Sequence, residues 1–493
     1  MSPIVLSVTI VAYFAILFTI SYIAGRKADN EGFFVGNRKS AWYIVAFAMI
    51  GSTISGVTFV SVPGMVQASS FSYLQMVLGF IVGQIIIAFV LVPLFYRMNQ
   101  VSIYEYLENR FGSSSYKTGA WFFFISKMLG AAVRLFLVCL TLQFLIFDPF
   151  HLPFLLNVIL TVFIVWLYTF RGGVKSLIWT DVLKTFCLVV SVVLCIYYIA
   201  SSLHLNFSGL VSTISDSDFS KTFFFDDVND KRYFFKQFLA GVFTVIAMNG
   251  LDQDMMQKNL SCKNLHEAQK NMYCYGISFV PVNFLFLSLG ILLLLFASQL
   301  NIPLPAAGDE ILPLFAAEGH LGFAVLIFFT IGIIAAAFSS ADSALTALTT
   351  SFCIDIAGIS HLSGKEAERR RKLVHFCISV LFIGFILLFK AVNNKSVIDA
   401  IYTIASYTYG PLLGLFAFGL FTPMRPRDRF VPYIAIASPL LCYAIDRLVF
   451  TSTGYQFGYE MLMFNGFLTF MGLTCLSIKT KNYGNTQCRI CSK

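Results

Sequence analysis

The hydrophobic pattern of the chain is a series of apolar runs separated by short polar segments. Each run is close to the roughly 20 residues that an α-helix needs to cross the hydrocarbon core of a bilayer. The pattern predicts thirteen membrane-spanning helices, at 4–25, 41–62, 73–96, 118–147, 153–170, 175–202, 233–257, 271–299, 321–356, 373–390, 397–421, 430–450 and 457–478. We therefore expect an all-α polytopic membrane protein, with residues 1–493 forming a single transmembrane domain.

Composition and charge agree with this interpretation. The chain is 58% hydrophobic and only 12% charged, whereas soluble domains have about 45–50% apolar and about 25% charged residues. The net charge of +9 comes from Lys and Arg residues, most of which lie in one set of alternate loops, Lys258 among them. Positively charged loops face the cytoplasm, so we expect the N-terminus outside and the C-terminus inside. The charge thus reports topology and does not indicate a nucleic-acid partner.

Two predicted spans contain clusters of small and hydroxyl residues. The second reads "YIVAFAMIGSTISGVTFVSVPG", and Gly and hydroxyl residues permit local unwinding of a membrane helix. An unwound stretch presents carbonyl oxygens, which are good ligands for a hard cation. The alternative is a packing face for a neighbouring helix.

The ninth span contains "AAAFSSADSALTALTTSF". At helical spacing, Ala336, Ser339, Ser340 and Ser343 lie on one stripe, with Asp342 at its edge. Hydroxyl and carboxylate oxygens suit Na⁺. The alternative is again helix packing, with Asp342 paired to a basic residue.

Ionisable residues inside the other spans are the remaining candidates, because a charge in a membrane needs a partner. Arg134 lies near the middle of the fourth span, and its partner is either a substrate carboxylate or a structural carboxylate such as Asp342. Lys127 is close enough to the cytoplasmic end to snorkel. Asp181 either has a functional role or simply forms an i,i+3 ion pair with Lys184.

No motif indicates catalysis. The sequence contains no HExxH, GxSxG or Walker pattern, so we expect no enzyme activity. The partners we infer are a small-molecule solute and the lipid bilayer, with no obligate protein partner.

Six segments of the chain match a known family in its motif order: "GRKADNEGFFVGNRKSAWYIVAFAMIGSTISGVTFVSVPG", "VSIYEYLENRF", "GGVKSLIWTDVLK", "DQDMMQK", "SSADSALTALTTSFCIDI" and "GPLLGLFAFGLF". On these motifs the chain resembles the sodium:solute symporter family, which includes sodium/glucose, proline and sialic acid cotransporters. The resemblance implies a LeuT-like core of two inverted five-helix repeats, whose first helices are broken near the midplane. It divides the chain into an extra N-terminal helix (4–25), a first repeat (41–202), a second repeat (233–421) and two C-terminal helices (430–478).

The resemblance also implies site residues. The main sodium site would use the following carbonyl and hydroxyl groups: Gly51, Ile54, Ala336, Ser339 and Ser340. A possible second cation site, for Na⁺ or H⁺, would use these positions: Thr53, Asp342 and Ser343. Asp342 stands where we expect Ser in relatives, which leaves the identity of the second ion open. Asp181 matches an aspartate on the sodium exit path.

For the substrate, the resemblance implies contacts from these residues: Ser55, Thr58, Tyr73, Gln75 and Arg134. The function we expect is Na⁺-coupled import of a small organic solute across the plasma membrane (the bacterial inner membrane), with a carboxylate such as sialic acid favoured. A sugar or polyol is the alternative, with Arg134 then paired to Asp342. A sensor or channel of the same fold that no longer couples is a further alternative.

Overall fold

The computed structural model describes residues 3–26, 30–54, 56–98, 101–305, 308, 311–317, 322–358, 364–392, 397–455 and 457–478. Ser55 lies outside the described residues. The α-helices are α1 (Pro3–Gly25), α2 (Asn30–Val35), α3 (Trp42–Thr53), α4 (Gly56–Ser69), α5 (Tyr73–Ile86), α6 (Val92–Met98), α7 (Glu105–Arg110), α8 (Ser113–Leu142), α9 (Phe154–Ser202), α10 (Phe207–Ser215), α11 (Phe234–Val245), α12 (Gln253–Asn259), α13 (Leu265–Leu300), α14 (Ile311–Ala317), α15 (Gly322–Ser351), α16 (Gly364–Val392), α17 (Val397–Phe421), α18 (Val431–Thr453) and α19 (Met461–Cys475).

Short turns and one small ribbon complete the fold. The π-helical turns are η2 (Ile87–Leu91), η3 (Gln143–Phe147), η6 (Ile246–Gly250) and η8 (Phe352–Ile356), and the 3₁₀ turns are η1 (Gly36–Arg38), η4 (Asp148–Phe150), η5 (Asp218–Ser220) and η10 (Asp428–Phe430). Strands β1 (Arg425–Pro426) and β2 (Ser477–Ile478) pair antiparallel. The fold is therefore all-α, as the sequence predicts.

Helices that could cross a membrane account for the predicted spans. Among the described residues, nine helices are long and apolar enough, two further pairs of bent helices pass the same test together, and Phe154–Phe170 and Met461–Cys475 are shorter apolar helices. Every predicted span overlaps one of these elements, while the number of crossings stays a prediction. The predicted loop between the fifth and sixth spans is instead a bend within α9, where Gly173 has φ 49°.

Two bent helices have the placement that the resemblance implies. The axes of α3 and α4 differ by 59°, and those of α11–η6 and α12 differ by 72°. At the first break Ile54 has the extended angles φ −75°, ψ 93°. At the second, Asp252 is extended and caps the start of α12, where its side chain accepts a hydrogen bond from the amide of Asp254. The first helix of each expected repeat is thus broken.

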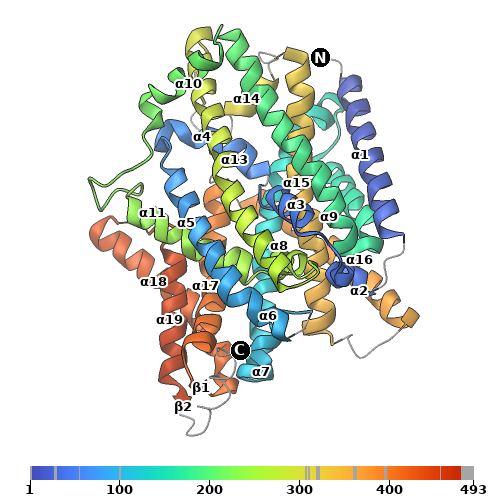
Figure 1. The fold of residues 1–493 in the computed structure, drawn as a ribbon, viewed down its shortest axis with the longest axis vertical. Coiled ribbons are helices and arrows are strands. Elements are labelled where there is room, and N and C mark those ends of the chain that lie inside the picture. The colour runs from blue at the N-terminus through green and yellow to red at the C-terminus, as the bar shows by residue number, and fades with distance from the viewer. Residues whose placement is uncertain are drawn as a thin grey trace.

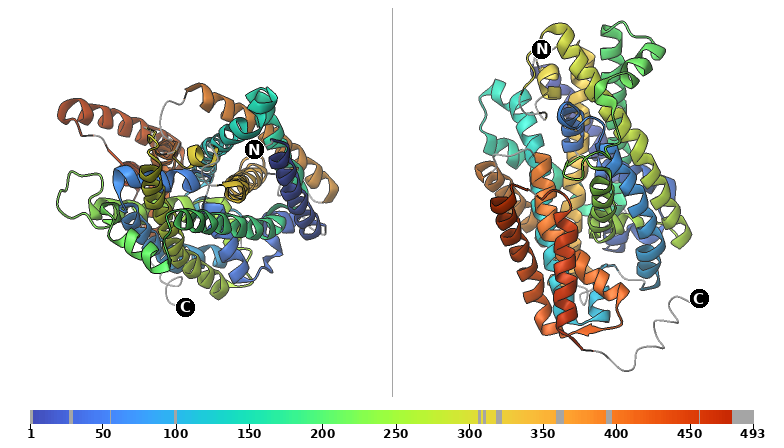
Figure 2. Two further views of the ribbon diagram at one scale, coloured as in Figure 1. Left: turned by 90° about the horizontal axis from the view of Figure 1, so that it is seen from above. Right: turned by 90° about the vertical axis from the view of Figure 1, so that its left-hand side faces the viewer.

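The bundle is organised around α9 and α15, which pack against each other, and α3 packs against α9. Helix α1 lies along one side of the bundle and the C-terminal pair α18 and α19 along the opposite side (Figures 1 and 2). The start of α1 and the β1–β2 ribbon lie at opposite ends of the long axis (Figure 1). This arrangement places the two breaks and the polar stripe of α15 in the interior.

Candidate functional site

The end of α3 meets the polar stripe of α15. The hydroxyl of Ser340 lies 3.5 Å from the carbonyl oxygen of Ser52 and 3.4 Å from that of Ala336. The last carbonyl groups of a helix have no i+4 amide to accept from, so the break after Thr53 leaves oxygen atoms available at this end of α3. The structure therefore brings the α3 terminus that contains Gly51 and Ser52 to Ala336 and Ser340.

Gly51 has a packing role that the sequence did not reveal. A Cβ atom built on Gly51 would lie 2.0 Å from the hydroxyl oxygen of Thr185 on α9. That hydroxyl donates to the carbonyl of Phe47 at 3.0 Å. Glycine is thus required for the close approach of α3 and α9, independently of any ion that its carbonyl binds.

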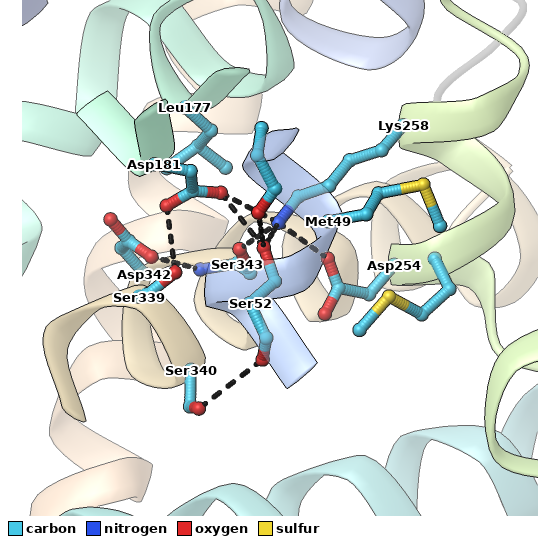
Figure 3. Close-up of polar contacts among 12 residues, drawn as sticks. Met49, Ser52, Leu177, Asp181, Asp254, Lys258, Ser339, Ser340, Asp342 and Ser343 are labelled. Carbon is cyan, nitrogen blue, oxygen red and sulfur yellow. Dashed lines mark hydrogen bonds and ion pairs between the residues drawn. The ribbon is translucent and has the colours of Figure 1, made fainter. Parts of the chain in front are cut away.

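Asp181 lies at the centre of this region and is fully buried. Its Oδ1 accepts from the Ser339 hydroxyl at 2.9 Å, and its Oδ2 accepts from the Ser52 hydroxyl at 3.0 Å. The ammonium of Lys258 lies 2.8 Å from Oδ2, and that of Lys184 lies 3.2 Å from Oδ1. Figure 3 shows the long side chain of Lys258 reaching Asp181, Ser52 and Ser343. Asp181 therefore links α9 to α3, α12 and α15.

Asp342 pairs with a lysine and a tyrosine. Its Oδ2 accepts from the Tyr168 hydroxyl at 2.7 Å and from the ammonium of Lys184, while its Oδ1 accepts from the amide of Ser343 at 2.7 Å. Arg134 is not a partner. The pairing of Arg134 with Asp342, one of the sequence alternatives, is therefore absent from the described residues.

The three residues expected at a second cation site do not converge. The hydroxyl of Thr53 lies 2.5 Å from that of Tyr275 and donates to the carbonyl of Met49. That of Ser343 accepts from Lys258 at 2.6 Å, and Asp342 holds Lys184. Two of these three positions thus already face a lysine ammonium.

The segment "DQDMMQK" is an interior helix. Every residue of α12 is buried, and Lys258 is only 1% exposed, so it is no cytoplasmic loop charge as the sequence suggested. Lys127 on α8 does not snorkel, because it lies 3.1 Å from Asp252 and 2.8 Å from Asp254. Asp252 also accepts from the hydroxyl of Tyr409 at 2.6 Å. Burial forces these ions to pair.

A second interior region is a cavity lined by both polar and apolar side chains. The polar ones include Thr53, Thr58, Tyr73, Gln84, Lys127, Arg134, Asn249, Asp252 and Asn283, and the apolar ones include Phe80, Met248, Phe279 and Ile401. Arg134 makes no ion pair with any described residue. The side-chain oxygens of Gln84 and Asn283 are buried and have no hydrogen-bond partner among the described residues.

Of the expected substrate contacts, the structure brings together Thr58, Tyr73 and Arg134. Gln75 does not line this cavity. Its amide nitrogen donates to the carbonyl of Arg232 at 2.8 Å, and its oxygen accepts from the amide of Phe224 at 3.2 Å, so it anchors the segment before α11. Gln84 and Asn283 were not among the predicted contacts, although both are polar residues inside predicted spans, which was the available signal.

Known proteins share the sequence pattern and the fold of this chain. The sequence profile of the Sodium:solute symporter family matches residues 33–425. The chain belongs to this family. It is 26% identical to the sodium/sialic acid symporter SiaT of Proteus mirabilis over 426 residues, covering 83% of this chain and 82% of the relative. It is 25% identical to the sodium/sialic acid symporter NanT of Aliivibrio fischeri, covering 84% and 82%.

A solved structure of a substrate-bound, outward-open Na⁺-coupled sialic acid symporter superposes with a TM-score of 0.81 at 20% identity, covering 95% of this chain and 97% of that chain. This likeness shows the LeuT-like fold. As a member of the sodium:solute symporter family, the protein is a membrane transporter of a small solute and not an enzyme, and Na⁺ is its coupling ion.

Proposed function

We propose that the protein imports a small carboxylate solute together with Na⁺, and that a sialic acid is the first substrate to test. The observation that carries this proposal is a contrast between three buried lysines and the partly buried Arg134. Lys127, Lys184 and Lys258 all bind carboxylates of the protein, whereas Arg134 faces the cavity without an ion pair among the described residues. A guanidinium in such surroundings is stabilised by an anionic ligand, which it binds through two parallel hydrogen bonds.

The rest of the lining supports a ligand with hydroxyl and amide groups. The unpartnered oxygens of Gln84 and Asn283 are hydrogen-bond acceptors, and the hydroxyl of Thr58 both donates and accepts. A buried acceptor without a partner is costly. A ligand that offers O–H or N–H donors to both oxygens removes that cost. Sialic acids combine a carboxylate with such donors, and the two sialic acid symporters noted above are consistent with this choice.

The ion site of the proposal lies between α3 and α15. The carbonyl oxygens of Gly51, Ile54 and Ala336 and the hydroxyls of Ser339 and Ser340 hold Na⁺. The ion fixes the end of α3, and Thr53 at that end and Thr58 on α4 line the solute cavity. Binding of Na⁺ therefore orders the solute cavity, and bound solute must tighten Na⁺ binding by the same factor. Na⁺ then leaves past Asp181 on the inner side.

The proposed orientation puts the N-terminus outside and the C-terminus in the cytoplasm of a bacterial inner membrane. A larger cavity adjoins the substrate cavity at Tyr73 and is lined by Lys231, Arg232 and Lys236 as well as by Asp446 and Glu460. Arg232 lies 2.8 Å from Asp230 and lowers the pKa of that carboxyl. We propose that this cavity is the outer entrance through which the solute reaches the substrate cavity. Its basic side chains attract an anion.

The test is uptake of labelled N-acetylneuraminate into proteoliposomes with an inward Na⁺ gradient. We expect uptake that stops when choline replaces Na⁺. Arg134→Ala should weaken solute binding by about 30-fold or more, because truncating one partner of a buried charge pair costs about 2–5 kcal/mol. Arg134→Lys keeps the charge without the bidentate geometry, so its affinity for the solute should lie between those of the native protein and Arg134→Ala.

A matched control is Arg447→Ala, because Arg447 is exposed and its side chain contacts the ring and hydroxyl of Tyr443 on its own helix. It should transport like the native protein. Equal uptake by Arg134→Ala and the native protein would contradict the carboxylate proposal. A sugar or polyol transporter would give that result, although the Arg134–Asp342 pair which that alternative required is absent from the described residues.

A further inference from the structure

The candidate ion site contains a buried chain of ion pairs. It begins at Asp342, which holds the ammonium of Lys184. Lys184 lies 3.2 Å from Asp181, and its ammonium is 5.4 Å from the centre of the Tyr168 ring. All three charged side chains are inaccessible to solvent. Lys184 therefore contacts two carboxylates at once, in the position where an inorganic cation between Asp181 and Asp342 would otherwise lie.

A second lysine reaches the same place from another helix. The ammonium of Lys258 donates to Asp181 Oδ2 at 2.8 Å, to the Ser343 hydroxyl at 2.6 Å and to the hydroxyl of Ser52. An ammonium has three N–H donors, so these three oxygens occupy it completely. These oxygens belong to α9, α15 and α3 (Figure 3). The Lys258 ammonium is thus a monovalent cation bound by oxygen atoms from three helices, which is how a sodium site binds Na⁺.

The chain continues toward the solute cavity. Lys258 lies 3.8 Å from Asp254, Asp254 lies 2.8 Å from Lys127, and Lys127 lies 3.1 Å from Asp252. Both Lys127 and Asp252 line the cavity. The side chains of all these residues are at most 7% exposed.

Counting charge along this connected set gives a definite result. The carboxylates are Asp342, Asp181, Asp254 and Asp252, and the ammonium groups are Lys184, Lys258 and Lys127. With every ion pair charged, this set has one excess negative charge. Arg134 lines the same cavity as Lys127 and Asp252 but makes no ion pair with any described residue, so its charge is counted with the solute carboxylate. One Na⁺ balances the excess negative charge, and a second Na⁺ would leave an uncompensated positive charge in the membrane interior, where charges are strongly penalised.

We infer that Lys184 and Lys258 are tethered cations which take the place of a second Na⁺, so that the transporter binds one Na⁺ per cycle. This inference rests on the proposed sodium site at Ser339 and Ser340. Two of the three positions expected to hold a second cation, Asp342 and Ser343, are occupied by these ammonium groups. With a monocarboxylate bound at Arg134, the loaded transporter carries one Na⁺ and one anion, and its transport cycle moves no net charge.

The direct test is equilibrium binding of radioactive Na⁺ to the purified native protein without solute. We expect one Na⁺ per protein and a Na⁺ titration with a Hill coefficient of about 1. Two Na⁺ per protein would overturn the tethered-cation inference while leaving the proposed sodium site intact. No bound Na⁺ would overturn the proposed site as well, so the two failures are distinguishable.

Variants of Lys184 sharpen the test. Lys184→Met removes the charge at similar size and should admit a second Na⁺, raising the binding ratio to two and the Hill coefficient above one. Lys184→Arg keeps the charge and should bind one. If Lys184→Met fails to fold, the double variant Lys184→Met with Asp342→Asn removes one cation and one anion together and should bind one Na⁺. A folded Lys184→Met protein that binds one Na⁺, or a double variant that binds two, would overturn the inference.

Discussion

Two polar regions lie a short distance apart in the interior of this transporter, and they satisfy their charges in opposite ways. Around Asp181 and Asp342, each charged group pairs with one from a neighbouring helix, and the connected set that continues to Asp254 and Asp252 has one excess negative charge. In the cavity, Arg134 has no ion pair among the described residues, and the oxygens of Gln84 and Asn283 have no hydrogen-bond partner there. Both regions share the physical constraint that a buried polar group needs a partner.

The two regions differ in which partners the protein itself supplies. The first region carries lysines that substitute for mobile cations, so little room is left there for more than one ion. In the second region the described residues supply no partners for Arg134 and the two oxygens, which leaves a cationic and hydrogen-bonding surface for a ligand. The lysine-filled region therefore sets the number of coupled ions, and the cavity sets the chemistry of the solute.

The largest effect should come from breaking the first region at its centre. Asp181→Ala leaves Lys184 and Lys258 without a shared carboxylate, and removing one partner of a buried ion pair costs about 3–5 kcal/mol. We expect that loss in the free energy of unfolding, measured by denaturant titration in detergent without Na⁺. Asp226→Ala breaks an exposed pair with Lys221 and should change it by less than about 0.5 kcal/mol. Equal effects would mean that the buried ion pairs of the first region stabilise the protein no more than an exposed pair does.

The next-largest effect is expected from variants of the proposed sodium site in the first region. The double variant Ser339→Ala with Ser340→Ala removes two hydroxyls of the proposed sodium site, each worth about 1 kcal/mol. We expect the half-saturating Na⁺ concentration for uptake to rise by about tenfold or more. The control replaces two exposed hydroxyl residues on α18, Thr451 and Ser452, by Ala. Unchanged Na⁺ dependence in the Ser339 and Ser340 variant would place the ion elsewhere.

The smallest effect probes the second region. Gln84→Leu removes an unpartnered buried oxygen, so the free energy of unfolding should stay the same or rise slightly. Solute binding should weaken by about three- to tenfold, because one hydrogen bond worth about 0.5–1.5 kcal/mol is lost. Calorimetric titration of solute and thermal unfolding of the same sample would measure both. A variant that loses stability and keeps its affinity would assign Gln84 to the scaffold.

Much of the fold could be predicted from the sequence because hydrophobic runs report membrane helices directly. The break near Ile54 was also predictable, since Gly51 and the hydroxyls around it are unusual inside a span. These two features are local, and each depends on residues close together in the chain. The contact of Ser340 with the end of α3 spans 288 residues, and it was expected from the hydroxyl-rich stripe of α15 and from the family resemblance.

The ion pairs could not be predicted because they join helices distant in sequence. Lys258 stands only a few residues from Lys263 and looked like one more cytoplasmic charge, yet the 72° bend before α12 turns it into the interior. Lys184 was recognised as an i,i+3 neighbour of Asp181, but its contact with Asp342 spans 158 residues. Gln75 shows the opposite error, because a polar residue in a span anchors a loop rather than the solute.

In the transport cycle proposed above, one Na⁺ balances the lysine-filled region and one carboxylate balances Arg134. The most direct test is the equilibrium accumulation of labelled sialic acid in proteoliposomes, at a fixed Na⁺ gradient, with the membrane potential clamped by a potassium gradient and valinomycin. The account predicts the same accumulation at zero potential and at about 100 mV negative inside. A membrane potential of that size is worth about 2.3 kcal/mol per net charge moved, so accumulation that rises by about 50-fold would contradict it.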